Sequence, residues 1–259
     1  MRYNSIEIEN KKKFTHSIIL KSEKNGNALN QLLIKELTHA FENLSKDLSC
    51  RAIILESKSK IFCAGADLKE LKEMQNNDYK KNLEDSKKLM NLFQKILSIE
   101  KLVIAKVDGA AIAGGCGLAT ACDIIFGTEN AKFGYTEVNI GFVPALVSTF
   151  LSKRVPDFLS KELFLTGKIL DSKQAEKIHL IDYYVKAEKL DEEIEKYIQD
   201  FLKKSSPESV SATKKMLYSF LGIEKKMNLA CEINAKSRKN KDCLKGISRF
   251  LKKERNYWN

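Results

Sequence analysis

Several features typical of membrane or exported proteins are missing from this sequence. Proline is rare, with three in 259 residues, and no stretch has the composition of a flexible linker. The longest uncharged apolar run, residues 109–122, is too short and too rich in glycine to cross a membrane. The first residues, MRYNSIEIENKKKF, contain no apolar signal core. We therefore expect a cytoplasmic protein that does not associate with a membrane.

Motifs for metal binding and for nucleophilic catalysis are also missing. The six cysteines form no CxxC pair and do not cluster with the three histidines, so no metal-ligand spacing is present. Because the cysteines lie among small or apolar residues, we expect them to be core residues of a protein in a reducing compartment. No GxSxG nucleophile elbow occurs. These absences leave a metalloenzyme or a serine hydrolase without support.

The net charge is strongly positive, at +11. Lysines are scattered through nearly every expected helix, and no long basic run is interleaved with aromatic residues. Most of them are therefore expected to be solvated, whereas a few could bind the phosphates of a small molecule. Nucleic-acid binding is poorly supported.

Strand and helix patterns alternate along the first half of the chain. Five segments have the alternation or the short apolar run of a β-strand: 3–9, 16–22, 51–57, 101–107 and 122–128. Residues 30–45 and 78–98 have apolar residues at helical spacing. This order predicts an α/β fold.

The pattern beyond residue 146 is mostly helical. Pro207, preceded by serine, marks the first turn of a helix. Apolar stripes run along 190–202 and along 244–251, where they include Leu244, Ile247 and Leu251. These stripes exceed what a solvated tail should expose, so we expect them to pack on the core or on a partner subunit. The predicted division is a core at 1–200 and a helical segment at 201–259.

Two glycine-containing segments could present free backbone N–H groups. In KIFCAGADLKE, residues 60–70, Gly65 permits a tight turn, and the Asp67-x-x-Glu70 spacing is that of a capping box. This leaves the Ala66 N–H at the positive end of a helix. In AIAGGCGLATACD, residues 111–123, the adjacent Gly114 and Gly115 again precede a short helix. Two such N–H groups on separate loops could converge on one oxygen, as an oxyanion site requires.

A third segment, AKFGYTEVNIGFVP at 131–144, contains a single acid. Glu137 lies among apolar and aromatic residues. If it is partly buried, its proton affinity is raised to the range that a general acid/base needs. The alternative interpretation is a surface glutamate on a connection between a strand and a helix.

Four motifs together resemble those of a known family. NGNALN, IFCAGADLKEL, VDGAAIAGGCGLATACDI and FGYTEVNIGFVP, in this order and spacing, resemble the enoyl-CoA hydratase/isomerase (crotonase) superfamily. The likeness extends through LTGKILDSKQAEKIHLID and GISRFLKKERNYW, so it covers nearly the whole chain. It implies a spiral of ββα repeats with a helical C-terminal oligomerisation region, assembled as a homotrimer or a dimer of trimers. It also implies an acyl-CoA thioester substrate and no cofactor, because coenzyme A is part of the substrate.

The resemblance assigns roles to individual residues. The thioester oxygen is expected between the N–H groups of Ala66 and Gly114, and Glu137 matches the family's acid/base. Adenine recognition matches the backbone from Ala64 to Leu68. The remaining substrate contacts that it implies are Asp67 of that loop, Ala28 of the 24–28 loop and the phosphate-binding candidates Lys24, Lys60 and Lys69.

One position departs from the pattern of typical hydratases. They carry a second glutamate on the glycine-rich helix, where this chain has Gly117. The departure leaves Glu137 as the single acid/base and is expected to leave room beside the acyl chain, with Gly117 at the substrate. One-glutamate patterns are similar to those of Δ3,Δ2-enoyl-CoA isomerases and of some hydratases of branched acyl-CoAs. The stretch GFVPALVSTFL resembles bacterial methylglutaconyl-CoA hydratase-like proteins.

Hydration of a 2-enoyl-CoA is therefore the leading prediction. Migration of a double bond is the first alternative, because the same glutamate would shuttle a proton between C2 and C4. The second alternative is a non-catalytic homologue that binds RNA through its basic surface.

Overall fold

The computed structural model describes residues 2–254 and residue 258. Its strands form two sheets, with the orders β1-β2-β3-β5-β7-β10 and β4-β6-β8-β9. The strands are β1 (Ile6–Lys12), β2 (Thr15–Leu20), β3 (Ala52–Ser57), β4 (Ile61–Cys63), β5 (Leu102–Val107), β6 (Ala110–Ile112), β7 (Ile124–Gly127), β8 (Lys132–Gly134), β9 (Ile169–Asp171) and β10 (Tyr183–Tyr184).

Successive strands alternate between the two sheets. The pairs β3 and β4, β5 and β6, and β7 and β8 each give their first strand to the larger sheet and their second to the smaller one. Pairing is parallel along β2-β3-β5-β7-β10 and β4-β6-β8, whereas β1 and β9 pair antiparallel with their neighbours at the edges. This confirms the predicted α/β class and the spiral of ββα repeats.

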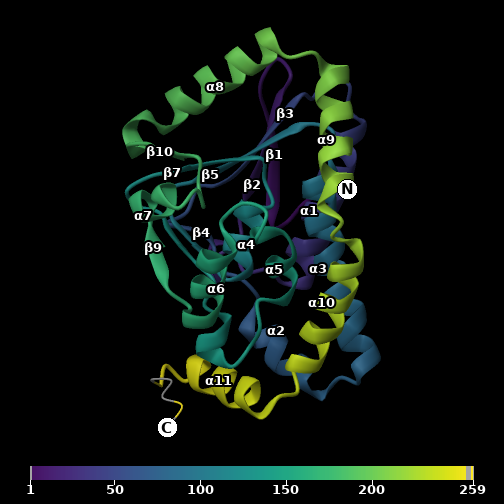
Figure 1. The fold of residues 1–259 in the computed structure, drawn as a ribbon, viewed down its shortest axis with the longest axis vertical. Coiled ribbons are helices and arrows are strands. Elements are labelled where there is room, and N and C mark those ends of the chain that lie inside the picture. The colour runs from purple at the N-terminus through teal and green to yellow at the C-terminus, as the bar shows by residue number, and fades with distance from the viewer. Residues whose placement is uncertain (1, 255–257, 259) are drawn as a thin grey trace.

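The helices cover the two sheets and form the C-terminal part of the chain. They are α1 (Gln31–Lys46), α2 (Leu68–Glu73), α3 (Tyr79–Ser98), α4 (Gly114–Thr120), α5 (Ala145–Leu151), α6 (Asp157–Thr166), α7 (Ser172–Lys177), α8 (Leu190–Lys204), α9 (Pro207–Leu221), α10 (Glu224–Ser237) and α11 (Lys241–Leu251). Short 3-10 turns include η1 (Glu23–Asn25) and η3 (Glu137–Ile140). Figure 1 shows α8 across one end of the molecule, α9 and α10 in succession down one side, and α11 at the opposite end near α2.

The apolar stripe of α8 packs on the larger sheet, as predicted. Leu190, Ile194 and Ile198 are buried in one cluster with strand residues that include Ile104 and Phe126. Residue 200, where the sequence suggested a division, lies within α8. The chain leaves that helix only after Lys204.

The last helices pack against the same chain. α10 contacts α3 and α5, and α11 contacts α2 and η3. Cys243 and Ile247 of α11 are buried, whereas Leu244 is 37% exposed in the single chain. The helix approaches η3 closely at Gly246, where a Cβ atom would lie 2.4 Å from the Ile140 carbonyl oxygen. Residues 255–257 of the GISRFLKKERNYW motif, and residue 259, lie outside the described residues.

The cysteines of the chain lie in its core. All six cysteines are buried and free, which confirms their assignment to the core. Within residues 2–254 and 258, no helix has the length and apolarity needed to cross a membrane. The same residues contain no group of three or more histidine, cysteine or acidic side chains arranged to hold a metal ion.

Candidate active site

A small, mostly apolar cavity lies where the motifs IFCAGADLKEL, VDGAAIAGGCGLATACDI and FGYTEVNIGFVP meet. It has a volume of about 140 Å³ and is lined by the 64–68 loop, the start of α4, η3 and α5, together with residues of α3 and α10. Among its described lining residues, the polar side chains are those of Thr136, Glu137 and Asn234. An apolar protein cavity of about 150 Å³ can hold benzene, so this one is suited to an acyl group of roughly six non-hydrogen atoms.

The 64–68 loop is held in place by the 24–29 segment. Gly65 has φ +87°, a conformation that strongly favours glycine. Its carbonyl accepts a hydrogen bond from Leu29 N–H at 2.7 Å, and the Ala64 N–H donates to the Gly26 carbonyl at 3.0 Å. The buried Asn27 side chain donates to the carbonyls of Ile61 and Phe62 at 3.0 and 3.1 Å. The sequence analysis did not single out Asn27, which fixes the register between these two loops.

The start of α4 closely approaches β4. A Cβ atom at Gly115 would lie 2.0 Å from the Cys63 carbonyl oxygen, so no other residue fits without a backbone shift. Ala113, immediately before the helix, has φ 52° and donates its N–H to the Gly134 carbonyl at 2.7 Å. Such a strained, non-glycine conformation is typical of functional sites.

Ala66 and Gly114 both line the cavity, and their backbones lie close together. A Cβ atom at Gly114 would lie 4.0 Å from the Ala66 nitrogen and 3.2 Å from Leu29 Cδ1. Neither N–H donates to an acceptor within the described part of the chain. The two loops are therefore in close contact at the cavity, and the convergence of their two N–H groups on one oxygen stays a prediction.

The helix after Ala66 begins with a side-chain cap. Asp67 Oδ1 accepts from the N–H groups of Lys69 and Glu70, at 2.9 and 3.3 Å. The second half of the predicted capping box is wrong, because Glu70 accepts from the Gln31 N–H at 3.0 Å instead. Glu70 therefore links α2 to the start of α1.

Glu137 is buried at the cavity. It begins η3, is 7% exposed, and its Oε2 atom has no partner within the described residues. Burial raises the pKa of Glu137 from 4.5 to about 7, because an ionised carboxylate is poorly stabilised away from water. The alternative of a surface glutamate is therefore wrong. A carboxyl group that titrates near neutral pH can both accept and return a proton.

The prediction that Gly117 leaves room beside the substrate is wrong. A Cβ atom at Gly117 would lie 2.2 Å from Val147 Cγ1 and 3.4 Å from Phe93 Cζ. Gly117 is buried and is not among the residues that line the cavity, whereas Val147 and Phe93 are. The space in which a second glutamate would begin is thus filled by the valine side chain of α5.

The other predicted substrate residues divide into three groups. Ala64 and Leu68 line the cavity. Ala28 is buried in its loop, Asp67 caps α2, and neither lines this cavity. The three candidate phosphate ligands, Lys24, Lys60 and Lys69, are exposed.

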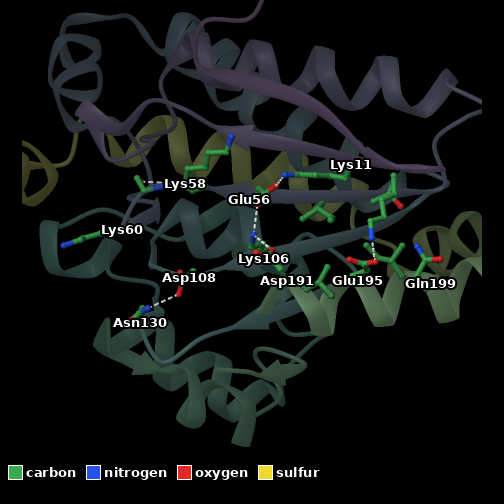
Figure 2. Close-up of a pocket in the computed structure, with 17 residues that line it drawn as sticks. Lys11, Glu56, Lys58, Lys60, Lys106, Asp108, Asn130, Asp191, Glu195 and Gln199 are labelled. Carbon is green, nitrogen blue, oxygen red and sulfur yellow. Dashed lines mark hydrogen bonds and ion pairs between the residues drawn. The ribbon is translucent and has the colours of Figure 1, made fainter. Parts of the chain in front are cut away.

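Lys60 lies at a second, larger cavity of about 990 Å³ between the larger sheet and α8. Figure 2 shows Lys11, Glu56 and Lys106 gathered in this cavity, with Lys60 apart from them. The Lys106 ammonium binds Glu56 at 2.9 Å and Asp191 at 2.6 Å. The cavity therefore has room for a ligand, but its central charges are already paired.

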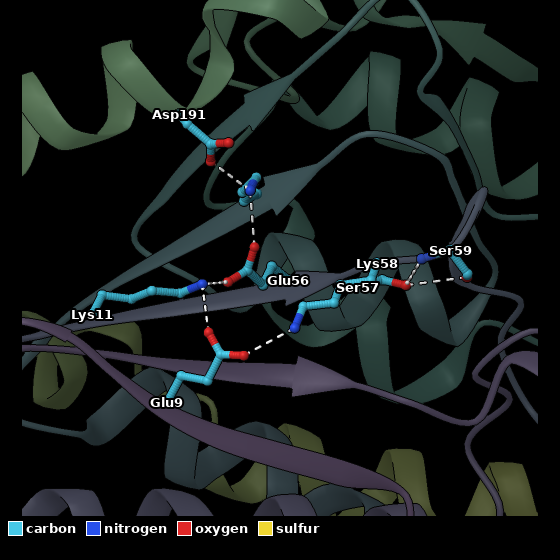
Figure 3. Close-up of polar contacts among 8 residues, drawn as sticks. Glu9, Lys11, Glu56, Ser57, Lys58, Ser59 and Asp191 are labelled. Carbon is cyan, nitrogen blue, oxygen red and sulfur yellow. Dashed lines mark hydrogen bonds and ion pairs between the residues drawn. The ribbon is translucent and has the colours of Figure 1, made fainter.

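The paired charges continue along the edge of the sheet (Figure 3). Lys11 bridges Glu56 and Glu9, at 3.2 and 2.8 Å, and Lys58 binds the other oxygen of Glu9 at 2.9 Å. Lys11, Lys58 and Lys106 each have an acidic partner. This network of ion pairs therefore offers no strong positive field to a polyanion. The smaller cavity, with its free amides and unpaired carboxyl group, is the better candidate for catalysis.

Comparisons with known proteins place the chain beside one family. The model of the enoyl-CoA hydratase/isomerase family matches residues 11–259. A Thermus thermophilus protein whose name describes an enoyl-CoA hydratase is 35% identical over 238 residues, which are 91% of this chain and 94% of that protein. A solved enoyl-CoA hydratase/isomerase from Xanthobacter autotrophicus Py2 is similar over 97% of this chain and 94% of its own, with a TM-score of 0.88 and 26% identity. A Mycobacterium avium enoyl-CoA hydratase has a TM-score of 0.87 and 26% identity, over 98% and 99% of the two chains.

Proposed function

Because the chain belongs to the enoyl-CoA hydratase/isomerase family, we propose that it adds water to the double bond of a short 2-enoyl-CoA. The observation that carries the proposal is the buried carboxyl group of Glu137, the one carboxyl group among the described residues that line the cavity. Ala66 and Gly114 line the same cavity, and their N–H groups have no acceptor within the described residues. No metal or redox cofactor has a part in this scheme.

The thioester oxygen is held by the two N–H groups in the proposed mechanism. Ionised Glu137 takes a proton from water, and the water oxygen bonds to C3. The electron pair of the double bond moves to C2 and onto the thioester oxygen, where Ala66 and Gly114 stabilise the enolate. Protonated Glu137 then returns its proton to C2, which completes the hydration and regenerates the carboxylate. A pKa of about 7 suits both transfers.

The size and lining of the cavity support a short acyl chain. Its volume is about 140 Å³, and Val147, Phe93 and Leu146 close it on the side of α4 and α5. A branched five- or six-carbon acyl group is within this size, as the GFVPALVSTFL stretch at residues 141–151 suggests. The same resemblance supports Lys24, Lys60 and Lys69 as ligands of the coenzyme A phosphates.

Double-bond migration is the second candidate. It needs one group that removes a proton at one carbon and returns it at another, and Glu137 is the single carboxyl group lining the cavity among the described residues. A panel of 2-enoyl- and 3-enoyl-CoAs with straight, branched and carboxylated chains separates the two reactions by product analysis. We expect 3-hydroxyacyl-CoA as the product. Exclusive formation of the isomeric enoyl-CoA would overturn hydration in favour of isomerisation.

A homotrimer or a dimer of trimers is the proposed assembly. Large apolar side chains are exposed on α9 and α10 in the described chain: Met216, Leu217, Phe220, Leu229 and Ile233. Phe220 alone is 72% exposed. A single chain rarely leaves such a group of side chains in water, so this surface is suited to contact with a second copy.

Charges placed on this surface are expected to break the assembly. Phe220→Asp combined with Leu229→Asp should shift the native mass from a multiple of three chains to one chain. Leu48→Asp is the matched control, because Leu48 is 91% exposed in the loop after α1 and belongs to neither α9 nor α10. This control should keep the wild-type mass. An active wild-type protein with the native mass of one chain would contradict the proposed assembly.

A further inference from the structure

One polar side chain in the cavity has no part in the proposed reaction. Asn234 of α10 lines the cavity and is 5% exposed. Its companions in the lining on the side of α2 and α3 are Leu71, Leu89 and Phe93, which offer no hydrogen bonds. A carboxamide that is so deeply buried normally has partners for both its oxygen and its nitrogen.

The hydrogen bonds of Asn234 determine which end of its carboxamide is free. Arg238 Nη2 lies 3.1 Å from Asn234 Oδ1, and Ser86 Oγ lies 2.8 Å from the same atom. A guanidinium can only donate, so the atom that it contacts must be the carboxamide oxygen. The Asn234 nitrogen has no acceptor within the described residues. Its two N–H donors are therefore unsatisfied within the described part of the protein, in a side chain that lines the cavity.

A buried ion pair holds this carboxamide in place. The Arg238 side chain, 4% exposed, forms an ion pair with Asp85 at 2.8 Å. Its Nη1 atom also lies 3.1 Å from the Met74 sulfur, and Arg238 is not among the residues that line the cavity. Because Asp85 balances the charge of Arg238, this arrangement fixes the Asn234 carboxamide and adds no net positive charge beside the cavity.

We propose that Asn234 is a specificity-determining residue that selects acyl groups with a hydrogen-bond-accepting oxygen near their distal end. The identification of the ligand as an acyl-CoA rests on the proposed function. An acyl chain that ends in a methyl group leaves the Asn234 N–H donors unpaired in an apolar cavity, whereas a carboxylate or ketone oxygen satisfies them. Sites that place a buried donor for a substrate atom discriminate strongly against analogues that lack it.

Binding of unreactive, saturated acyl-CoAs tests this selection independently of turnover. Pentanoyl-CoA, 4-oxopentanoyl-CoA and glutaryl-CoA have five-carbon chains that end in a methyl group, carry a ketone, or end in a carboxylate. We expect the wild-type protein to bind at least one of the two oxygen-bearing ligands about tenfold or more tightly than pentanoyl-CoA by calorimetry. Preference for 4-oxopentanoyl-CoA would show that the site selects a neutral oxygen of the acyl group, and preference for glutaryl-CoA would show that it selects a charged one.

Two substitutions of Asn234 and one control complete the experiment. Asn234→Leu and Asn234→Asp should reduce that preference to within about twofold, and the aspartate should bind glutaryl-CoA worst because the two carboxylates repel. Asn82→Asp makes the same chemical change at a fully buried residue of α3 that does not line the cavity, and it should keep the wild-type preference. Wild-type binding of pentanoyl-CoA by Asn234→Leu shows that the site remains folded.

Equal affinities of the wild-type protein for all three ligands, or an undiminished preference in both Asn234 variants, would overturn the proposal. Neither result bears on hydration, which is measured by product formation. Conversely, a product panel without 3-hydroxyacyl-CoA would overturn hydration and leave the ligand preference intact.

Discussion

Glu137→Gln is expected to lower kcat/KM by about 100-fold to 10,000-fold, the range that a positioned general acid/base contributes. The amide keeps the shape of the side chain but can neither accept the proton of water nor return it to C2. Glu70→Gln is the matched control. Glu70 is also partly buried with a raised pKa, but its carboxylate binds the Gln31 N–H outside the catalytic cavity. We expect the control to remain within a few-fold of wild type, and similar turnover by Glu137→Gln would contradict the assignment of the base.

The pH dependence gives the same prediction a second readout. Since burial raises the pKa of Glu137 to about 7, kcat/KM should fall about tenfold for each pH unit below 7 as the base becomes protonated. Between pH 4.5 and 7 the native state binds more protons than the unfolded state, so the stability contributed by Glu137 is lost as the pH rises through that window. Glu137→Gln should lack this loss and be more stable than wild type above pH 7, by up to about 3 kcal/mol in urea unfolding.

Most of the fold could be predicted because it rests on local patterns. The alternation of short apolar runs and helical stripes gave the α/β class, and the motif resemblance supplied the ββα spiral. Asp67 was predicted as a helix cap from its three-residue spacing to Glu70, and the structure confirms it. Its partner Glu70 was assigned wrongly, because the competing Gln31 N–H lies on another helix that comes close only in the folded chain.

The site was predictable where backbone geometry decides it and unpredictable where side chains from distant elements meet. Gly65 and Gly114 indicate close backbone approaches from sequence alone. In contrast, the sequence alone assigns no individual role to Val147 or Asn234. The role of each residue depends on a contact with a distant helix. Val147 packs against Gly117 of α4, and Asn234 contacts Ser86 of α3. No spacing rule within one helix carries that information.

Gly117→Glu is expected to destabilise the protein by about 3 kcal/mol or more, because it overpacks a buried site and adds an unpaired carboxyl group. The Cβ atom would lie 2.2 Å from Val147 Cγ1. Val147→Ala removes that methyl group, so the double variant should recover at least about 1 to 3 kcal/mol relative to the sum of the two single effects. Urea unfolding of the wild type, both single variants and the double variant measures this coupling.

The double variant should also regain a second acid/base beside the cavity. Its kcat/KM for hydration is expected to exceed that of Val147→Ala by about tenfold or more, within the range of a positioned acid. Gly117→Ala, alone and with Val147→Ala, repeats the steric conflict without a carboxyl group. This alanine pair should show the stability coupling but no gain in rate. If Gly117→Glu were as stable as wild type, the valine would not fill the space. If the alanine pair gained as much rate as the glutamate pair, the gain would come from the larger cavity. The added carboxyl group would then have no catalytic role, which would contradict the prediction.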